Sequence, residues 1–238
     1  MNLIAHTNLD EAEKERDNKE GLAWKLNVLI PKKLAEICKA QDIFLLHIST
    51  DAIFPGSEEF KGPYKEDQIP NVYSKDLSWY GETKRQGEIV INNYAERYAI
   101  VRIDYPFGNA DLERDFAKKT YSYILAGYPL FVDQIFNPTY LPDLNAALKK
   151  IIEYEKEGIF HVATKGLTTP YDFGKLLVEI KGLKTEIKKG SAKEFMNSLG
   201  KPARPLFGGL DIQKTEEILG LEFHNLEDAL REFSENIS

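Results

Sequence analysis

A tyrosine and a lysine lie four residues apart in the segment LSWYGETKRQGE, which spans residues 77–88. In a helix this spacing places the phenol of Tyr80 and the ammonium of Lys84 on one face, one turn apart. A free phenol has a pKa of about 10, and a neighbouring cation favours the phenolate and lowers that pKa. The pair is therefore suited to exchanging a proton with a substrate. The same spacing is also common on ordinary helix surfaces, so the pair alone leaves both interpretations open.

Short apolar runs and amphipathic segments alternate along the first two thirds of the chain. Apolar runs rich in β-branched and aromatic residues predict buried strands over 1–5, 42–50, 98–104 and 158–163. Amphipathic segments predict helices over 19–41, 76–97 and 143–157. This alternation predicts an α/β fold with a doubly wound parallel sheet, and the small number of strands indicates a sheet truncated at one edge.

The pattern changes after residue 164. Thr169 is a predicted N-cap, Pro170 stands at the first helical position and Gly182 is a predicted stop, and a last helix is expected over 225–236. Together with residues 108–131, this region predicts a smaller α+β lobe beside the sheet.

The predicted strand ends define where a ligand would bind. In an open α/β sheet, ligands bind beyond the carboxyl ends of the strands. Three such ends, followed by Thr7, Asp51 and Tyr105, should therefore share one crevice, and Tyr80 should begin a helix at the same rim. Carbonyl reduction is the chemistry that these groups favour. Thr50 would hold the substrate oxygen while Tyr80 donates the proton, and a hydride donor would also be needed.

Composition excludes several other classes of protein. The chain has 238 residues, of which 42% are hydrophobic, as a folded globular protein requires. Its net charge of −7 disfavours binding to nucleic acid or an anionic membrane. A single cysteine, the lack of a signal sequence and the lack of a long apolar stretch favour a cytoplasmic protein. The four histidines have no metal-ligand spacing, so no metal site is expected.

Several motifs occur in an order typical of one family. They are HISTDAIFPG, GPYKEDQIPN, WYGETKRQGE, VRIDYPFG, DQIFNPTYLPDLNAAL and ARPLFGGLD. The chain thereby resembles the extended short-chain dehydrogenase/reductases, and most closely the dTDP-4-dehydrorhamnose reductase branch. The resemblance implies a partial NAD(P)-binding, Rossmann-like domain formed by residues 1–107 and 132–163. It implies a substrate-binding lobe formed by residues 108–131 and 164–238.

The resemblance also implies a function and a set of site residues. The implied reaction is NAD(P)H-dependent reduction of a 4-keto-6-deoxysugar nucleotide, as in dTDP-rhamnose biosynthesis. The implied catalytic residues are Thr50, Tyr80, Lys84 and Asn27, of which Asn27 would support a proton-relay water. Ala5 and Thr7 would lie along the nicotinamide ribose together with Tyr80 and Lys84. Asp51, Tyr105 and Arg204 would contact the nucleotide sugar. The residues around Asp51 and Glu66 favour loop hydrogen bonds over an acid–base pair of these two.

The sequence departs from the family pattern in three ways. No G-x-G-x-x-G spacing occurs, and the first glycine is Gly21, so weaker binding of NADPH or NADH is expected. Ala52 replaces a tyrosine of the family's substrate site, and the segment between Asp67 and Tyr80 is a few residues longer than usual. The alternative is a non-catalytic regulatory or binding protein on the same scaffold, like the regulatory subunit of methionine adenosyltransferase. A homodimer or a partner subunit would then cover the truncated sheet edge.

Overall fold

A computed structural model of the chain describes residues 1–68, 77–200 and 202–234. Its central sheet has three parallel strands in the order β1-β2-β4, which are β1 (Leu45–Thr50), β2 (Tyr98–Ile103) and β4 (Gly158–Val162). The register sets Thr50 opposite Ile103, at the carboxyl ends of β1 and β2. Residues that follow these two strands are therefore neighbours at one edge of the sheet.

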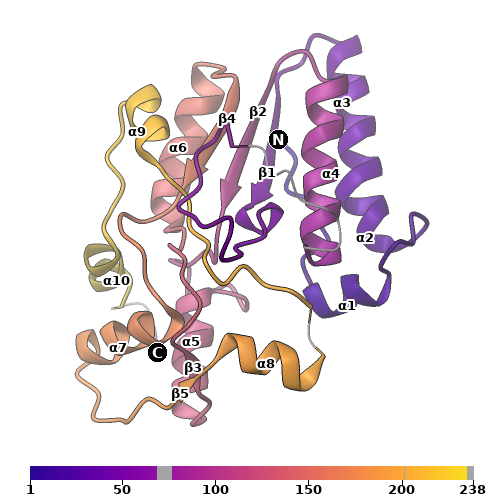
Figure 1. The fold of residues 1–238 in the computed structure, drawn as a ribbon. Coiled ribbons are helices and arrows are strands. Elements are labelled where there is room, and N and C mark those ends of the chain that lie inside the picture. The colour runs from indigo at the N-terminus through magenta and orange to yellow at the C-terminus, as the bar shows by residue number, and fades with distance from the viewer. Residues whose placement is uncertain (69–76, 201, 235–238) are drawn as a thin grey trace.

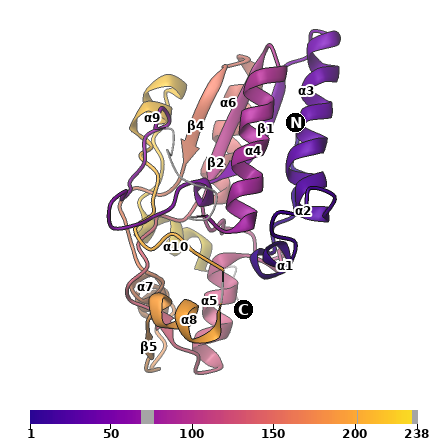
Figure 2. The ribbon, with the colours of Figure 1, turned by 45° about the vertical axis from the view of Figure 1, so that its right-hand side comes forward.

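Helices cover both faces of the sheet (Figures 1 and 2). One face carries α3 (Ile30–Ala40) and α4 (Trp79–Tyr94), and the other carries α6 (Leu141–Glu153) and α9 (Gln213–Leu219). Apolar side chains such as Leu46, Val101 and Phe160 are at most 1% exposed in the main core. The strands read as apolar runs because both of their faces are buried.

Two short α-helices, a π-helical turn and a 3-10 turn complete the sheet domain. They are α1 (Leu9–Lys14), α2 (Leu22–Trp24), a π-helical turn η1 (Lys25–Leu29) that joins α2 to α3, and a 3-10 turn η2 (Asp51–Ile53) directly after β1.

A second, smaller lobe lies beyond the carboxyl ends of the strands (Figure 1). It contains α5 (Phe116–Leu125), α7 (Pro170–Ile180), α8 (Ala192–Leu199) and α10 (Leu226–Ser234), with a small parallel sheet of β3 (Leu130–Phe131) and β5 (Lys189–Gly190). Thr169 caps α7 by accepting a hydrogen bond from the Asp172 amide, as predicted. Phe107, Phe173 and Phe233 form an aromatic core in this lobe.

The predicted strand over 1–5 is wrong. Only Asn2 pairs beside β1, through a hydrogen bond from its amide to the Leu46 carbonyl (2.7 Å) and one from the Ile48 amide to its own carbonyl (3.2 Å). Leu3 and Ile4 are 61% and 51% exposed. The described residues therefore do not bury the apolar side chains of Leu3 and Ile4.

Two helix predictions also need correction. The predicted helix over 19–41 begins at Leu22 and contains the π-helical turn. The charged cluster over 11–20 is helical only to Lys14. Glu13 in this cluster accepts a hydrogen bond from the Trp79 amide (2.8 Å), so part of the cluster is structural. The predicted helix over 76–97 spans Trp79–Tyr94, and residue 76 lies outside the described residues.

A buried ionic network links β2, α4 and β4. The Arg102 guanidinium donates two hydrogen bonds to the Glu88 carboxylate, at 3.1 and 2.8 Å, and it contacts His161 Nε2 at 3.2 Å. Arg102 is 3% exposed and His161 is fully buried. Burial, followed by the charge of Arg102, lowers the pKa of His161 to about 3, so this histidine is neutral in the folded protein.

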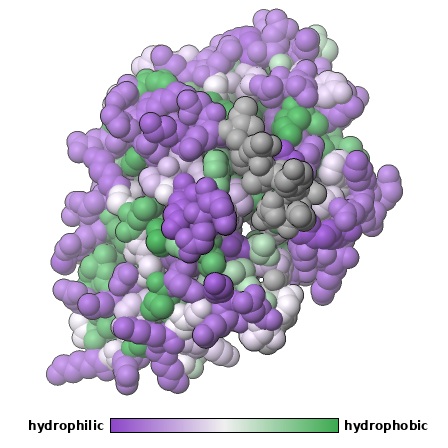
Figure 3. Space-filling view, in the orientation of Figure 1, coloured by the Kyte–Doolittle hydropathy of each residue, from purple (hydrophilic) through white to green (hydrophobic). Residues whose placement is uncertain are grey.

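Hydrophilic residues cover most of the face of the molecule seen in Figure 3. Hydrophobic residues appear there as small separate groups. Among the residues that the structure describes, no helix is long and apolar enough to span a membrane.

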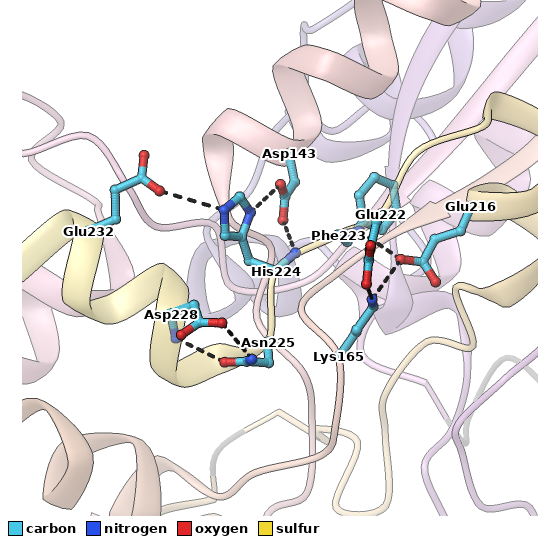
Figure 4. A network of polar contacts seen from close by, with 9 residues as sticks. All are labelled: Asp143, Lys165, Glu216, Glu222, Phe223, His224, Asn225, Asp228 and Glu232. Atoms are coloured by element: carbon cyan, nitrogen blue, oxygen red, sulfur yellow. Dashed lines mark hydrogen bonds and ion pairs between the residues drawn. The ribbon is translucent and has the colours of Figure 1, made fainter.

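A second polar network joins the two lobes (Figure 4). His224, just before α10, places Nδ1 2.7 Å from Asp143 Oδ1 on α6, and its backbone amide donates to Asp143 Oδ2 (2.9 Å). Its Nε2 faces Glu232 on α10 at 3.6 Å. The histidine thus fixes the start of α10 against α6.

We expect His224→Ala to lower the free energy of unfolding by about 1–3 kcal/mol, because buried Asp143 would keep only one hydrogen-bond donor. Urea denaturation measures the change. Lys165→Ala is the matched control from the same figure, since Lys165 pairs with Glu216 and Glu222 at the surface and such pairs contribute at most about 1 kcal/mol. Equal losses in the two variants would contradict the assigned role of His224.

Candidate active site

The amino-terminal turn of α4 positions Tyr80 at the sheet edge. Ser78 caps the helix, and its hydroxyl accepts a hydrogen bond from the Gly81 amide (3.1 Å). A Cβ atom at position 81 would lie 2.1 Å from the Ala52 carbonyl oxygen, so only glycine permits this close approach of α4 to η2. Tyr80 is thereby held beside the end of β1.

Thr50, the last residue of β1, faces Tyr80. Its hydroxyl accepts a hydrogen bond from the Ala52 amide (3.2 Å) and donates one to Asp51 Oδ1 (3.3 Å). The Thr50 side chain lies near enough to the Tyr80 hydroxyl to lower its pKa, against the larger effect of burial. Both side chains are buried, at 8% and 9% exposure. This arrangement brings together the two hydroxyl groups that the sequence predicted at the substrate oxygen.

The pKa of Tyr80 differs from the prediction. Burial raises the pKa of its hydroxyl to about 12, the Thr50 contact opposes this change, and the carboxyl groups of Asp51 and Asp104 add to it. The predicted lowering by Lys84 is therefore wrong in this structure, because burial dominates. Tyr80 is protonated at neutral pH and is an available acid.

Lys84 lies one turn farther along α4 and points to the sheet. Its ammonium donates to the Ile48 carbonyl (2.7 Å) and contacts His47 Nε2 at 3.3 Å. The side chain is 2% exposed, and burial lowers its pKa to about 8 while Glu88 opposes this change. Asn2 contacts the other ring nitrogen of His47 at 2.9 Å. Lys84 therefore lies in a buried polar row between α4 and the amino-terminal segment.

Asn27 in η1 fixes the chain next to the site. Its Oδ1 accepts a hydrogen bond from the His6 amide (2.8 Å), and its Nδ2 donates to the His6 carbonyl (3.1 Å) and to Thr83 Oγ1 (2.9 Å). The side-chain amide thus holds the segment that carries Ala5 and Thr7. The Thr7 hydroxyl in turn accepts a hydrogen bond from Arg114 (3.0 Å).

Asp51 and Asp104 form a buried carboxyl pair. They follow β1 and β2 directly, and the register of these strands makes them neighbours. Their side chains are both buried, at 6% and 5% exposure. Burial raises the pKa of Asp51 to about 6, and burial with the charge of Asp51 raises that of Asp104 well above its usual range. Both carboxyl groups are therefore harder to ionise than an exposed aspartate.

Glu66 is not part of this pair. It accepts a hydrogen bond from Thr215 (2.9 Å), and its carbonyl faces Arg102 in the buried ionic network. Asp104 was absent from the predicted site residues. The signal that could have found it is its place at a strand end, in register with Asp51.

Tyr105 and Arg204 line the side of the site that faces the second lobe. Tyr105 has a positive φ of 35°, and its ring packs between Phe116 and Phe136. Its hydroxyl accepts a hydrogen bond from Gln134 (3.0 Å). Arg204 lies near enough to Tyr105 to lower its pKa, against the larger effect of burial that raises it to about 12. Arg204 Nε is buried without a hydrogen-bond partner among the described residues.

A small cleft opens beside these residues. It has a volume of only about 10 Å³, and its lining includes Ala52, Phe54, Leu77, Ser78, Arg204 and Pro205. The small side chain of Ala52 leaves this space between η2 and the segment before Phe207. Within the described ranges, no group of three or more potential metal ligands occurs.

The residues at the nicotinamide end of the site fit a nicotinamide nucleotide. Two of the three N–H donors of Lys84 have partners in the described chain, which leaves one for a ribose hydroxyl. The glycine-rich turn that binds a pyrophosphate is not found in this sequence. The described residues therefore include a donor suited to the nicotinamide ribose of the cofactor. The glycine-rich turn that would bind its phosphates is not among them.

Fold and site together define a class: a Rossmann-like α/β protein of the short-chain dehydrogenase/reductase type. The family model described as "RmlD substrate binding domain" matches residues 1–238, and the chain belongs to this family.

Curated relatives of the chain include two proteins named for polysaccharide synthesis. The probable low-salt glycan biosynthesis reductase Agl14 of Haloferax volcanii is 30% identical over 97% of this chain and 74% of its own length. The spore coat polysaccharide biosynthesis protein SpsK of Bacillus subtilis is 31% identical over 98% of this chain and 77% of its own.

Solved structures of dTDP-4-dehydrorhamnose reductases are similar to the whole chain. The enzyme from Clostridium acetobutylicum has a TM-score of 0.84 and 27% identity, over 99% of this chain and 79% of its own. The enzyme from Bacillus anthracis, solved in complex with NADP, has a TM-score of 0.83 and 26% identity, over 98% and 79% of the two chains.

Proposed function

We propose that this chain reduces the keto group of a 4-keto-6-deoxysugar nucleotide to an alcohol, with a reduced nicotinamide nucleotide as the hydride donor. The observation that supports the proposal is the placement of Thr50 at the end of β1 and of Tyr80 in the first turn of α4, both buried at the carboxyl edge of the sheet, with Lys84 one helical turn from Tyr80. Membership in the reductase family makes this chemistry the expected one.

Each catalytic group has a distinct role in the proposed reaction. Thr50 donates a hydrogen bond to the substrate carbonyl oxygen and stabilises the charge that develops there. Tyr80 then donates its proton to that oxygen. Because the pKa of the Tyr80 hydroxyl is raised, this hydroxyl is protonated at neutral pH and can act as the acid. Lys84 binds a ribose hydroxyl of the cofactor, and Asn27 holds the segment with Ala5 and Thr7 along the same ribose.

Residues from both lobes supply the substrate contacts in this proposal. Asp51 accepts a hydrogen bond from the sugar, Tyr105 packs against it, and Arg204 binds a diphosphate oxygen. An unpaired, buried guanidinium nitrogen supports this role, because a charged donor needs an acceptor when it is buried. The proposal assigns residues 108–131 and 164–238 to the substrate-binding lobe, apart from α9, which packs on the sheet, and it assigns residues 1–107 and 132–163 to the cofactor side.

A turnover assay tests the proposal. We expect the purified chain to oxidise NADPH in the presence of dTDP-4-keto-6-deoxymannose, and NADPH is chosen because a solved relative is a complex with NADP. NADH is the parallel arm, and NADPH without sugar is the blank. A folded protein that leaves both cofactors unchanged with the sugar nucleotide would contradict the proposal.

Ala52, which lines the small cleft where the family has a tyrosine, favours a second candidate, a non-catalytic binding protein on the same scaffold. Calorimetric titration separates the two candidates. A reductase must bind NADPH, with or without the sugar nucleotide, whereas the alternative predicts that the sugar nucleotide binds and NADPH does not.

A further inference from the structure

We propose that Glu13 is a positioning residue for Tyr80: its carboxylate, which comes from α1, holds the first turn of α4 and thereby keeps the Tyr80 side chain at the carboxyl edge of the sheet. This inference rests on the proposed function, because it assigns the group that keeps the acid in place. It extends the site to α1, an element that carries none of the assigned catalytic or ligand-binding residues.

The first turn of α4 has backbone donors that the helix itself cannot satisfy. The first four N–H groups of an α-helix have no intrahelical acceptor. Ser78 satisfies one of them, since its hydroxyl accepts a hydrogen bond from the Gly81 amide (3.1 Å). The Trp79 amide is another, and Trp79 is only 3% exposed, so it has little access to water. This amide donates instead to Glu13 Oε2 (2.8 Å).

A second contact fixes the backbone on the other side of Ser78. Arg16, two residues after α1, donates from Nη2 to the Leu77 carbonyl (2.8 Å) and to Glu13 Oε2 (3.1 Å). Its Nε also pairs with the Glu13 carboxylate. Leu77 is 1% exposed, so its carbonyl also has little access to water. The ion pair of Glu13 and Arg16 therefore holds the chain both before and after the helix cap.

The charge of Glu13 suits this position. The N-terminus of a helix carries a partial positive charge, which favours a carboxylate beside the first turn. Hydrogen bonds to an ionised acceptor are also about twice as strong as those between neutral groups. An uncharged acceptor in place of the carboxylate would therefore hold the Trp79 amide less firmly.

Packing passes the position of this turn on to Tyr80. Trp79 and Tyr80 belong to one small buried cluster with Ala12 of α1, and α1 lies beside the first turn of α4 (Figure 1). The Trp79 ring stacks on Trp24, with the ring centroids 5.8 Å apart. Because Tyr80 is the next residue of the same turn, a shift of the Trp79 backbone would move the Tyr80 hydroxyl as well.

α1 also joins this turn to the segment assigned to the nicotinamide ribose. Asn8, directly after Thr7, caps α1 by accepting a hydrogen bond from the Glu11 amide (3.2 Å). The Asn27 side chain fixes the His6 backbone just before it, at 2.8 and 3.1 Å. One short helix, anchored at both ends, therefore sets the spacing between the proposed ribose site and the turn that carries the acid.

Loss of the Glu13 carboxylate should loosen the first turn of α4 and displace the acid. We expect Glu13→Ala to lower kcat for NADPH oxidation with dTDP-4-keto-6-deoxymannose on the order of 100-fold, since a misplacement of about 1 Å has effects of this size. The KM of either ligand should change little. Glu13→Gln keeps an oxygen acceptor but loses the charge, so its kcat should fall less, by about 10-fold.

Glu20→Ala is the matched control, because Glu20 is an exposed carboxylate of the same charged cluster. Its kcat should stay within about twofold of the unsubstituted protein. A double variant separates positioning from a general loss of structure. In the Tyr80→Phe background, Glu13→Ala should lower the residual kcat no further, because no hydroxyl remains to be positioned. An undiminished loss in that background, or equal kcat in Glu13→Ala and Glu20→Ala, would overturn the inference.

Tryptophan fluorescence tests the placement of the turn without turnover. Trp24 and Trp79 are the two tryptophans of the chain, so the emission reports on this cluster. We expect Glu13→Ala to shift the emission to longer wavelength and to increase its quenching by acrylamide, whereas Glu20→Ala should change neither. An unchanged spectrum in Glu13→Ala would overturn the inference. A shifted spectrum in a protein that reduces no sugar nucleotide would establish that Glu13 anchors the turn and would refute the proposed reductase instead.

Discussion

Tyr80→Phe should lower kcat for NADPH oxidation with dTDP-4-keto-6-deoxymannose by about 100- to 10,000-fold, the usual contribution of a positioned general acid. The substitution removes only the hydroxyl. The ring keeps its place in the small cluster with Ala12, Ala23 and Trp79, so the fold and the binding of both ligands should survive. Steady-state kinetics measure the loss, and circular dichroism checks the fold.

Tyr98→Phe is the matched control for this variant. Tyr98 begins β2, and its hydroxyl donates to Asn92 at an exposed site away from the sheet edge that holds Thr50. We expect its kcat to stay within about twofold of the unsubstituted protein, since exposed single contacts have small effects. A Tyr80→Phe variant that behaves like this control would show that Tyr80 is not the acid.

Arg102→Met should lower the free energy of unfolding by about 3–5 kcal/mol. The methionine fills most of the space, but it leaves the Glu88 carboxylate buried at 7% exposure without its cation. It also removes the contact with His161 Nε2. For a chain of this size the loss corresponds to a decrease in Tm on the order of 10 °C, which calorimetry measures.

Arg97→Met is the matched control. Arg97 directly precedes β2, the strand that contains Arg102, and its ion pairs are at the surface. Arg97 pairs with Asp42 and Glu155, and both carboxylates are at least half exposed. Such pairs contribute at most about 1 kcal/mol. A smaller loss for Arg102→Met than for Arg97→Met would mean that the buried network does not stabilise the sheet.

The strands β1, β2 and β4 were predictable because burial on both faces leaves a continuous apolar run in the sequence. The Thr169 cap was predictable because a hydroxyl residue at the N-cap followed by proline at the first helical position is a common start of a helix. Residues 1–5 show that an apolar run alone does not predict a buried strand. Their apolar run matches a strand, yet Leu3 and Ile4 are exposed, because pairing depends on neighbours that a local pattern does not contain.

Within the site, only the relative positions of residues close together in the sequence were predictable. Tyr80 and Lys84 lie on one helix, so four residues of sequence fix their relation. The direction of the Tyr80 pKa was not predictable, because it depends on burial and on Asp51 and Asp104, which come from other elements. The Asp51 and Asp104 pair depends on strand register, and no motif in the sequence specifies that register.

Transfer of deuterium tests the central claim most directly. The purified chain would be incubated with dTDP-4-keto-6-deoxymannose and NADPH that carries deuterium at the transferable position, and the sugar nucleotide would be analysed by mass spectrometry and NMR. We predict a reduced product with one deuterium bound to C4 of the sugar. A folded protein that binds the sugar nucleotide but yields no deuterated product would contradict the account.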